Sequence, residues 1–259
     1  MASSCELTLI AAPEESAAAQ AAGLPVAHLA YRVGSGPHLF RANLPVAARG
    51  GLLAADCRGF DGRGEPSALC QEILRECSAR GFTGVYCGFE GRPFPLLRQA
   101  AAELEDLLER RGWPLYVPEA YAHGLRRARV LIPTALSGGS LEQRLSDAEE
   151  HFGRERVTLA VERVAMDFFL PSPTGQGVPL SREKLRARLE ELHPTVYFSR
   201  ELCAHYFTYM SKENGVHFVL YDDAGYIRKK LDIAGRMGIT RAFLPYGQAD
   251  DLLPRLLKP

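Results

Sequence analysis

Three carboxylates in this sequence follow short apolar runs that are typical of β-strands: Glu90, Glu119 and Asp167. Glu90 ends a strand-like run in residues 81–91, and the glycines on either side of it indicate a tight turn. Carboxyl groups that lie near one another can donate and accept protons while a bond is cleaved. The alternative is a surface glutamate that pairs with a loop amide or with Arg92.

The segment 81–91 resembles the fourth-strand signature of glycoside hydrolase family 18, the chitinase-like barrels, which reads D-G-x-D-x-D-x-E. Gly84 and Glu90 match the glycine and the general-acid glutamate of that signature. Three positions differ, because the family has aspartates where this chain has Thr83, Tyr86 and Gly88. The resemblance implies that Glu90 protonates the departing glycosidic oxygen. It also implies that the aspartate that orients this acid is replaced by glycine.

Two further carboxylates are candidates for a supporting role. The segment 164–171 resembles the family's sixth-strand M-x-Y-D, and Asp167 matches its aspartate. Such an aspartate contacts the sugar or raises the pKa of the acid through like-charge coupling; otherwise Asp167 is a turn or cap residue. Glu162 has the opposite strand parity and joins Asp167 only if the strand bulges. Glu119 serves as the second carboxylate if its distance from Glu90 suits a glycosidase, and is otherwise a salt-bridged rim group.

The closing part of the chain, from Tyr221 to Asp251, is similar to the last block of chitinase-like barrels. There, Y-D-D precedes a helix and the last strand, after which a tryptophan stacks on the sugar. The resemblance implies Tyr221, Asp222 and Tyr246 as substrate-binding residues, and Tyr121, which follows the strand-like segment from Leu115, is a fourth candidate. The simpler interpretation is a strand–helix–strand unit in which Asp222 or Asp223 caps the helix.

We expect neither a metal nor a cofactor. Asp56 and Asp61 lie near Arg58, and acidic loops that contain arginines usually pair internally. The histidines are scattered and lack the spacing of metal ligands. The segment Ser137–Ser140 could hold an anion on free backbone amides, but it lacks a phosphate-loop pattern and indicates a turn and a helix cap.

The elements that position these residues are typical of an α/β protein, and we predict a single (β/α)₈ TIM barrel as one domain over residues 1–259. The length of 259 residues fits such a barrel, which has ~250 residues. More segments resemble strands than the eight that a barrel needs. They are Leu7–Ala11, Ala27–Val33, Leu52–Cys57, Thr83–Phe89, Leu115–Glu119, Val130–Ala135, Val157–Phe169, Thr195–Phe198, Val216–Tyr221 and Thr240–Leu244. We expect Leu7–Ala11 and Thr195–Phe198 to be extra or edge strands.

The composition restricts the partners. With 31 basic and 31 acidic residues, the chain has no charge excess that would favour a nucleic acid or an anionic membrane. Acidic residues interrupt the N-terminal segment, so we expect no secretory signal, and no apolar run reaches the ~20 residues of a membrane span. The six cysteines show no CxxC spacing, which indicates free thiols and a cytoplasmic protein. The sequence does not indicate an oligomeric state.

Three functions therefore compete. The first is a glycosidase that acts on N-acetylglucosamine-containing or related glycans, with a carbohydrate ligand and Glu90 as general acid. The second is a degenerate barrel that has lost the aspartates and binds a glycan or a protein without hydrolysis. The third is unrelated chemistry on the same fold, which an anion beside Ser137–Ser140 would indicate.

Overall fold

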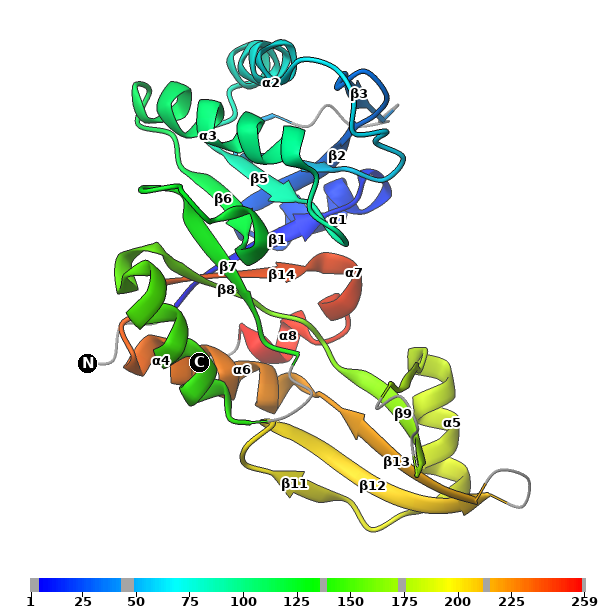
Figure 1. The fold of residues 1–259 in the computed structure, drawn as a ribbon. Coiled ribbons are helices and arrows are strands. Elements are labelled where there is room, and N and C mark those ends of the chain that lie inside the picture. Colours follow the sequence, from blue (N-terminus) through cyan, green and yellow to red (C-terminus); the bar gives the residue numbers. More distant parts are fainter. Residues whose placement is uncertain (1–4, 43–48, 136–138, 172–175, 212–214, 258–259) are drawn as a thin grey trace.

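The computed structural model describes residues 5–42, 49–135, 139–171, 176–211 and 215–257, and its main feature is a closed barrel (Figure 1). Neighbouring strands run parallel in the order β1-β14-β8-β7-β6-β5-β4-β2, and pairing of β1 with β2 closes the ring. The strands are β1 (Glu6–Ala11), β2 (Val26–Val33), β4 (Leu52–Asp56), β5 (Val85–Gly88), β6 (Leu115–Pro118), β7 (Arg129–Pro133), β8 (Val157–Ala160) and β14 (Arg241–Pro245). The predicted TIM barrel is confirmed.

Alternating side chains on these strands form two apolar layers. Inward-facing residues such as Ile10, Ala54 and Leu131 form one cluster inside the barrel, and the outward-facing residues pack against the helices. The ring centroid of Phe243 lies 4.7 Å from that of Tyr116 and 4.9 Å from that of Tyr86. These three rings close the interior of the barrel and separate its two ends.

Helices cover the outside of the barrel, and several begin and end where the sequence predicts. Pro66 is the first residue of α2, and Gly81 ends it with a φ of 70°. Ser140 accepts a hydrogen bond from the Gln143 backbone N–H and caps α4. The helical elements are η1 (Pro13–Glu15), α1 (Ser16–Ala21), α2 (Pro66–Arg80), α3 (Pro95–Glu109), η2 (Glu119–Tyr121), α4 (Leu141–Phe152), η3 (Arg154–Arg156), α5 (Arg182–Leu192), α6 (Ala224–Arg236), α7 (Tyr246–Ala249) and α8 (Leu253–Leu256).

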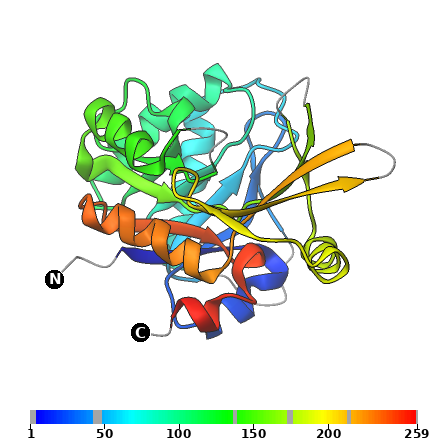
Figure 2. The same ribbon diagram turned by 90° about the horizontal axis from the view of Figure 1, so that it is seen from below.

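A second, antiparallel sheet branches from the barrel between β8 and α6 (Figures 1 and 2). Its order is β10-β9-β13-β12-β11, and α5 covers one face, where Leu185 packs with Phe207 and Val219. Its strands are β9 (Ala165–Leu170), β10 (Val178–Pro179), β11 (Tyr197–Ser199), β12 (Ala204–Ser211) and β13 (Gly215–Tyr221). A short strand, β3 (Leu39–Arg41), pairs antiparallel with β2 outside the ring. That residues 1–259 form one domain stays a prediction.

The structure corrects three strand predictions. Leu7–Ala11, expected to be extra, is the barrel strand β1, which pairs on both sides. Val157–Phe169 is two strands, β8 in the barrel and β9 in the second sheet, and Val216–Tyr221 also belongs to the second sheet. Ser137 lies outside the described residues. In the part of the chain that the structure describes, no helix is both long and apolar enough to cross a membrane.

Candidate active site

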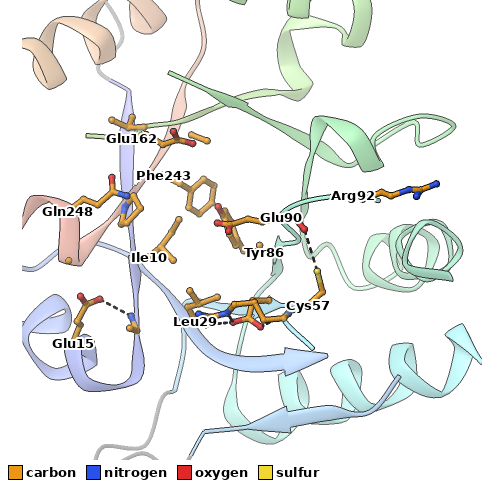
Figure 3. Close-up of a pocket in the computed structure, with 18 of the residues that line it drawn as sticks. Ile10, Glu15, Leu29, Cys57, Tyr86, Glu90, Arg92, Glu162, Phe243 and Gln248 are labelled. Carbon is orange, nitrogen blue, oxygen red and sulfur yellow. Dashed lines mark hydrogen bonds and ion pairs between the residues drawn. The ribbon is translucent and has the colours of Figure 1, made fainter. Parts of the chain in front are cut away.

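A cavity of about 810 Å³ opens at the C-terminal end of the barrel, where β1, β2, β4, β5, β8 and β14 end (Figure 3). In TIM barrels this end carries the chemistry, because the loops after all the strands meet there. Its apolar lining includes the rings of Tyr86, Phe94 and Phe243. Its polar lining residues are Glu15, Asp56, Arg58, Glu90, Arg92, Glu162 and Gln248.

Glu90 reaches this cavity from the end of β5, which is the fourth strand of the barrel, as the resemblance predicted. Phe89 beside it is buried and anchors the strand end, and Gly91 continues the turn with a φ of 79°. The Cys57 thiol lies 3.9 Å from the Glu90 backbone carbonyl oxygen (Figure 3). Among the described residues, no ion pair involves the Glu90 carboxylate, which is exposed to the cavity. It is therefore accessible to a ligand.

Glu162 enters the same cavity from the segment that follows β8, the seventh barrel strand. Its backbone N–H donates a 3.1 Å hydrogen bond to the hydroxyl of the buried Thr134, which holds the segment against β7. Burial raises the pKa of the Glu162 carboxyl, and the negative charge of Glu90 raises it further, while Lys230 opposes both effects. Glu162 therefore responds to the charge of Glu90 in the same cavity.

The hydroxyl of Tyr86 interacts electrostatically with both of these carboxylates. Burial raises the pKa of its hydroxyl, and the charges of Glu90 and Glu162 both add to that effect. Tyr86 replaces one aspartate of the family signature, and Gly88 replaces another. A Cβ atom at Gly88 would meet nothing closer than the Ala55 carbonyl oxygen at 3.4 Å, so the space for a side chain beside Glu90 exists.

The other carboxylates of the cavity have partners. Asp56 lies 2.5 Å from the Arg58 guanidinium and 3.3 Å from that of Arg32, which is the internal pairing expected for this loop. Glu15 accepts a 2.9 Å hydrogen bond from the Ala12 backbone N–H. The described residues contain no group of three His, Cys, Asp or Glu side chains that could hold a metal ion. Glu90 and Glu162 thus remain as the available acids.

Asp167 lies outside the cavity, because the chain leaves the barrel after β8 and Asp167 is on β9 of the second sheet. Its comparison with the family's sixth strand is wrong, since the sixth barrel strand is β7. The Asp167 carboxylate is only 6 % exposed and accepts hydrogen bonds from Tyr209 at 3.0 Å and His217 at 2.9 Å. It also pairs with Arg188 at 3.3 Å. In this structure Asp167 organises the second sheet.

Glu119 and Tyr121 lie on η2, after β6, and neither lines the cavity. Glu119 forms an ion pair with Arg144, which matches the rim-group alternative. Tyr121 is buried, its ring centroid is 5.4 Å from that of Phe89, and its hydroxyl accepts a 3.2 Å hydrogen bond from the Phe94 backbone N–H. Tyr121 therefore supports the loop that carries Glu90.

The remaining predicted residues also lie outside the cavity lining. Tyr221, on β13, stacks on His205 with a centroid distance of 5.2 Å. Asp222 is buried, and its carboxylate lies 2.6 Å from Lys230 and 2.9 Å from the Val164 backbone N–H. Tyr246 packs against a small apolar cluster at the start of α7, whereas Gln248 on the same turn reaches the cavity.

Glu90 is thus the only predicted site residue that lines the cavity, and sequence reasoning missed Glu162 and Gln248 as site residues. A signal for Glu162 was present, because it follows directly on the apolar run 157–161 that forms the seventh strand. Reading 157–169 as one continuous strand obscured it.

No family model matches the sequence. Several solved structures share its fold. The spore cortex-lytic enzyme SleL of Bacillus cereus has a TM-score of 0.71 at 15 % identity, over 100 % of this chain and 75 % of that one. SleL of Bacillus megaterium QM B1551 has a TM-score of 0.69 at 14 % identity, over 95 % and 71 %. A chitinase from Chromobacterium violaceum ATCC 12472 has a TM-score of 0.67 at 13 % identity, over 96 % and 97 %. The resemblance to chitinase-like barrels is confirmed at the level of the fold.

Proposed function

We propose that this protein hydrolyses glycosidic bonds in N-acetylglucosamine-containing or related glycans, with Glu90 and Glu162 as its two carboxylates. The observation that carries the proposal is that these two acids line one open cavity at the C-terminal end of the barrel, where the charge of Glu90 raises the pKa of Glu162. Glycoside hydrolysis needs a carboxylic acid that protonates the leaving oxygen, and usually a second carboxylate nearby. Chitinases and spore cortex-lytic enzymes share the fold, which supports a glycan as the substrate.

In this proposal Glu90 donates the proton, because it holds the position of the general acid in the fourth-strand signature. Glu162 is the second carboxylate. Glu90 passes its proton to the glycosidic oxygen, and the negative charge of Glu162 stabilises the positive charge that develops on the sugar ring.

The cavity also offers surfaces that suit a sugar. The rings of Tyr86, Phe94 and Phe243 supply apolar area for the C–H faces of a pyranose ring. Arg92 and Gln248 line the cavity at different strand ends and can donate hydrogen bonds to hydroxyl or acetamido oxygens. The substitution of tyrosine and glycine for two signature aspartates leaves the fold of β5 intact.

The test is the release of product from aryl-glycosides and chitooligosaccharides by the wild type and by Glu90→Gln. We expect turnover by the wild type and a loss of about 10²-fold or more in the variant, which is the usual contribution of a general acid. A protein that binds these glycans but never cleaves them, or a Glu90→Gln variant as active as the wild type, would refute the proposal.

One observation favours a second function, a barrel that binds glycan without hydrolysis. Gly88 leaves Glu90 without the aspartate that orients the acid in the family. Calorimetry with the same chitooligosaccharides separates the two functions. Binding of equal strength by the wild type and Glu90→Gln, with no product formed by either, would establish the binding function instead.

A further inference from the structure

Two arginines converge on the opposite, N-terminal end of the barrel. Arg129 begins β7 and Arg241 begins β14, and both lie at inward-facing positions, two residues before Leu131 and Phe243 of the interior cluster. Tyr116 on β6 joins them. Its hydroxyl accepts a 3.0 Å hydrogen bond from Arg241, and its ring centroid lies 5.9 Å from the Arg129 guanidinium carbon.

Among the described residues, no ion pair neutralises the positive charge of these two arginines. Arg129 is partly buried, yet its side chain makes no hydrogen bond or ion pair with any residue that the structure describes. Burial lowers the pKa of its guanidinium and the charge of Arg241 adds to that effect, while Tyr116 and the more distant Glu6 oppose it. Keeping two cations close together and partly removed from water, without an anion in direct contact, is unfavourable.

The nearby carboxylates that the structure describes form no ion pair with these two arginines. Glu109 pairs with Arg127 at 2.6 Å, and Glu105 accepts hydrogen bonds from the backbone N–H groups of residues 126–128. Glu6 lies opposite Arg241 in the strand register, but it forms no ion pair with a described residue. The two arginines therefore still have guanidinium N–H donors free for a ligand.

The same end of the barrel contains space for a ligand. Arg129 and Arg241 line a cavity of about 330 Å³, and Arg241 and Tyr116 line a neighbouring cavity of about 350 Å³. We propose that Arg129, Arg241 and the Tyr116 hydroxyl form a binding site for a tetrahedral oxyanion of the phosphate type. Two guanidinium groups match a dianion, and the Tyr116 hydroxyl, which accepts from Arg241, keeps its own proton to donate.

The oxyanion comes either as free phosphate or as the phosphoryl group of a larger molecule, for which the second cavity leaves room. This site is separate from the catalytic cavity, because the rings of Tyr86, Tyr116 and Phe243 lie between them. Its test therefore does not depend on glycan hydrolysis.

The experiment is calorimetric titration with sodium phosphate, with sodium chloride of equal ionic strength as the blank so that general screening is removed. We expect phosphate to bind to the wild type and about tenfold or more weakly to Arg129→Gln, since a charge-assisted hydrogen bond is lost. The matched control is Arg75→Gln, an exposed arginine on α2, which should bind as the wild type does. Because the Arg129 side chain makes no hydrogen bond or ion pair with a described residue, its variant should remain folded, and circular dichroism checks this.

A parallel titration with glucose 6-phosphate distinguishes the two sources. Equal affinity for both compounds identifies the free ion as the ligand, and tighter binding of the sugar phosphate identifies a phosphorylated organic molecule. The proposal is overturned if phosphate gives no heat beyond the chloride blank, or if folded Arg129→Gln binds it as tightly as the wild type.

Discussion

Replacing Lys230 with methionine tests how the structure holds Glu162 in the cavity of the proposed active site. Lys230 on α6 and Asp222 are both fully buried as side chains, and their charged atoms lie 2.6 Å apart. Asp222 also joins the barrel to the second sheet, because its carboxylate accepts from the Val164 N–H and its own N–H donates to the Val164 carbonyl at 2.8 Å. Val164 lies two residues after Glu162, so this contact positions the segment that carries Glu162.

The magnitude follows from burial. Methionine fills a similar volume, but it leaves the Asp222 carboxylate buried without a counter-ion, which costs about 3–5 kcal/mol. For a chain of this size the loss lowers the melting temperature by about 10 °C. Burial raises the pKa of Asp222, and the charge of Lys230 and its hydrogen bond lower it. The substitution removes these opposing effects and raises that pKa further.

The sign of the pH dependence follows. A carboxyl whose pKa is higher in the folded than in the unfolded state loses stability as pH rises from the unfolded to the folded pKa. Denaturant unfolding should therefore show a larger loss for Lys230→Met at about pH 8 than at about pH 5. The double variant Asp222→Asn, Lys230→Met should regain part of the loss, because no charge remains buried.

Lys229→Met is the matched control, since Lys229 is exposed on the same helix and should change stability by less than about 1 kcal/mol. A loss in Lys230→Met that is equal at both pH values, or single losses that add up fully in the double variant, would refute this reasoning. As a second readout, Lys230→Met should move the acidic limb of the activity profile to higher pH, because Lys230 lowers the pKa of Glu162, which acts in its ionised form.

Two further predictions concern β5 and α3. Gly88→Asp should fold, because its Cβ has room at 3.4 Å from the nearest atom, and should raise kcat/KM by roughly tenfold by adding the orienting carboxylate beside Glu90; a folded variant with unchanged kcat/KM on chitooligosaccharides would contradict this. Glu105→Gln should destabilise the fold by about 2–3 kcal/mol in denaturant unfolding, because Glu105 accepts backbone hydrogen bonds from residues 126–128. Burial opposes ionisation of Glu105, but these donors lower its pKa overall, so its contribution is lost as pH falls and the gap to the wild type should narrow in acid. A gap that widens in acid would count against it.

The sequence predicted the barrel and the place of Glu90 because both depend on local patterns. Buried parallel strands read as short apolar runs, and the glycines around Glu90 indicate a turn at a strand end. Gly84 is also explained, since a Cβ there would lie 2.8 Å from the Pro114 carbonyl oxygen. The helix caps at Pro66 and Ser140 depend on single residues and were predicted correctly.

The second sheet could not be predicted in the same way. Asp167 owes its environment to Tyr209 and His217, which are 42 and 50 residues away along the chain, and no local pattern contains such contacts. The change of sheet between β8 and β9 occurs within a run of strand-like residues, so the sequence shows one strand where the structure has two. The sequence prediction therefore placed Glu162 on one strand with Asp167, whereas the structure places it in the segment between β8 and β9. The cytoplasmic location stays a prediction.

The most direct test of the proposed site compares kcat/KM on one chitooligosaccharide among the wild type, Glu90→Gln, Glu162→Gln and Glu119→Gln. The proposal predicts a fall of about 10²-fold or more in the first two variants, since both carboxylates act on the bond. Glu119→Gln, which removes a rim carboxylate outside the cavity, should stay within about threefold of the wild type. A Glu162→Gln variant with wild-type kcat/KM, or a Glu119→Gln variant as impaired as Glu90→Gln, would contradict the assignment of the catalytic pair.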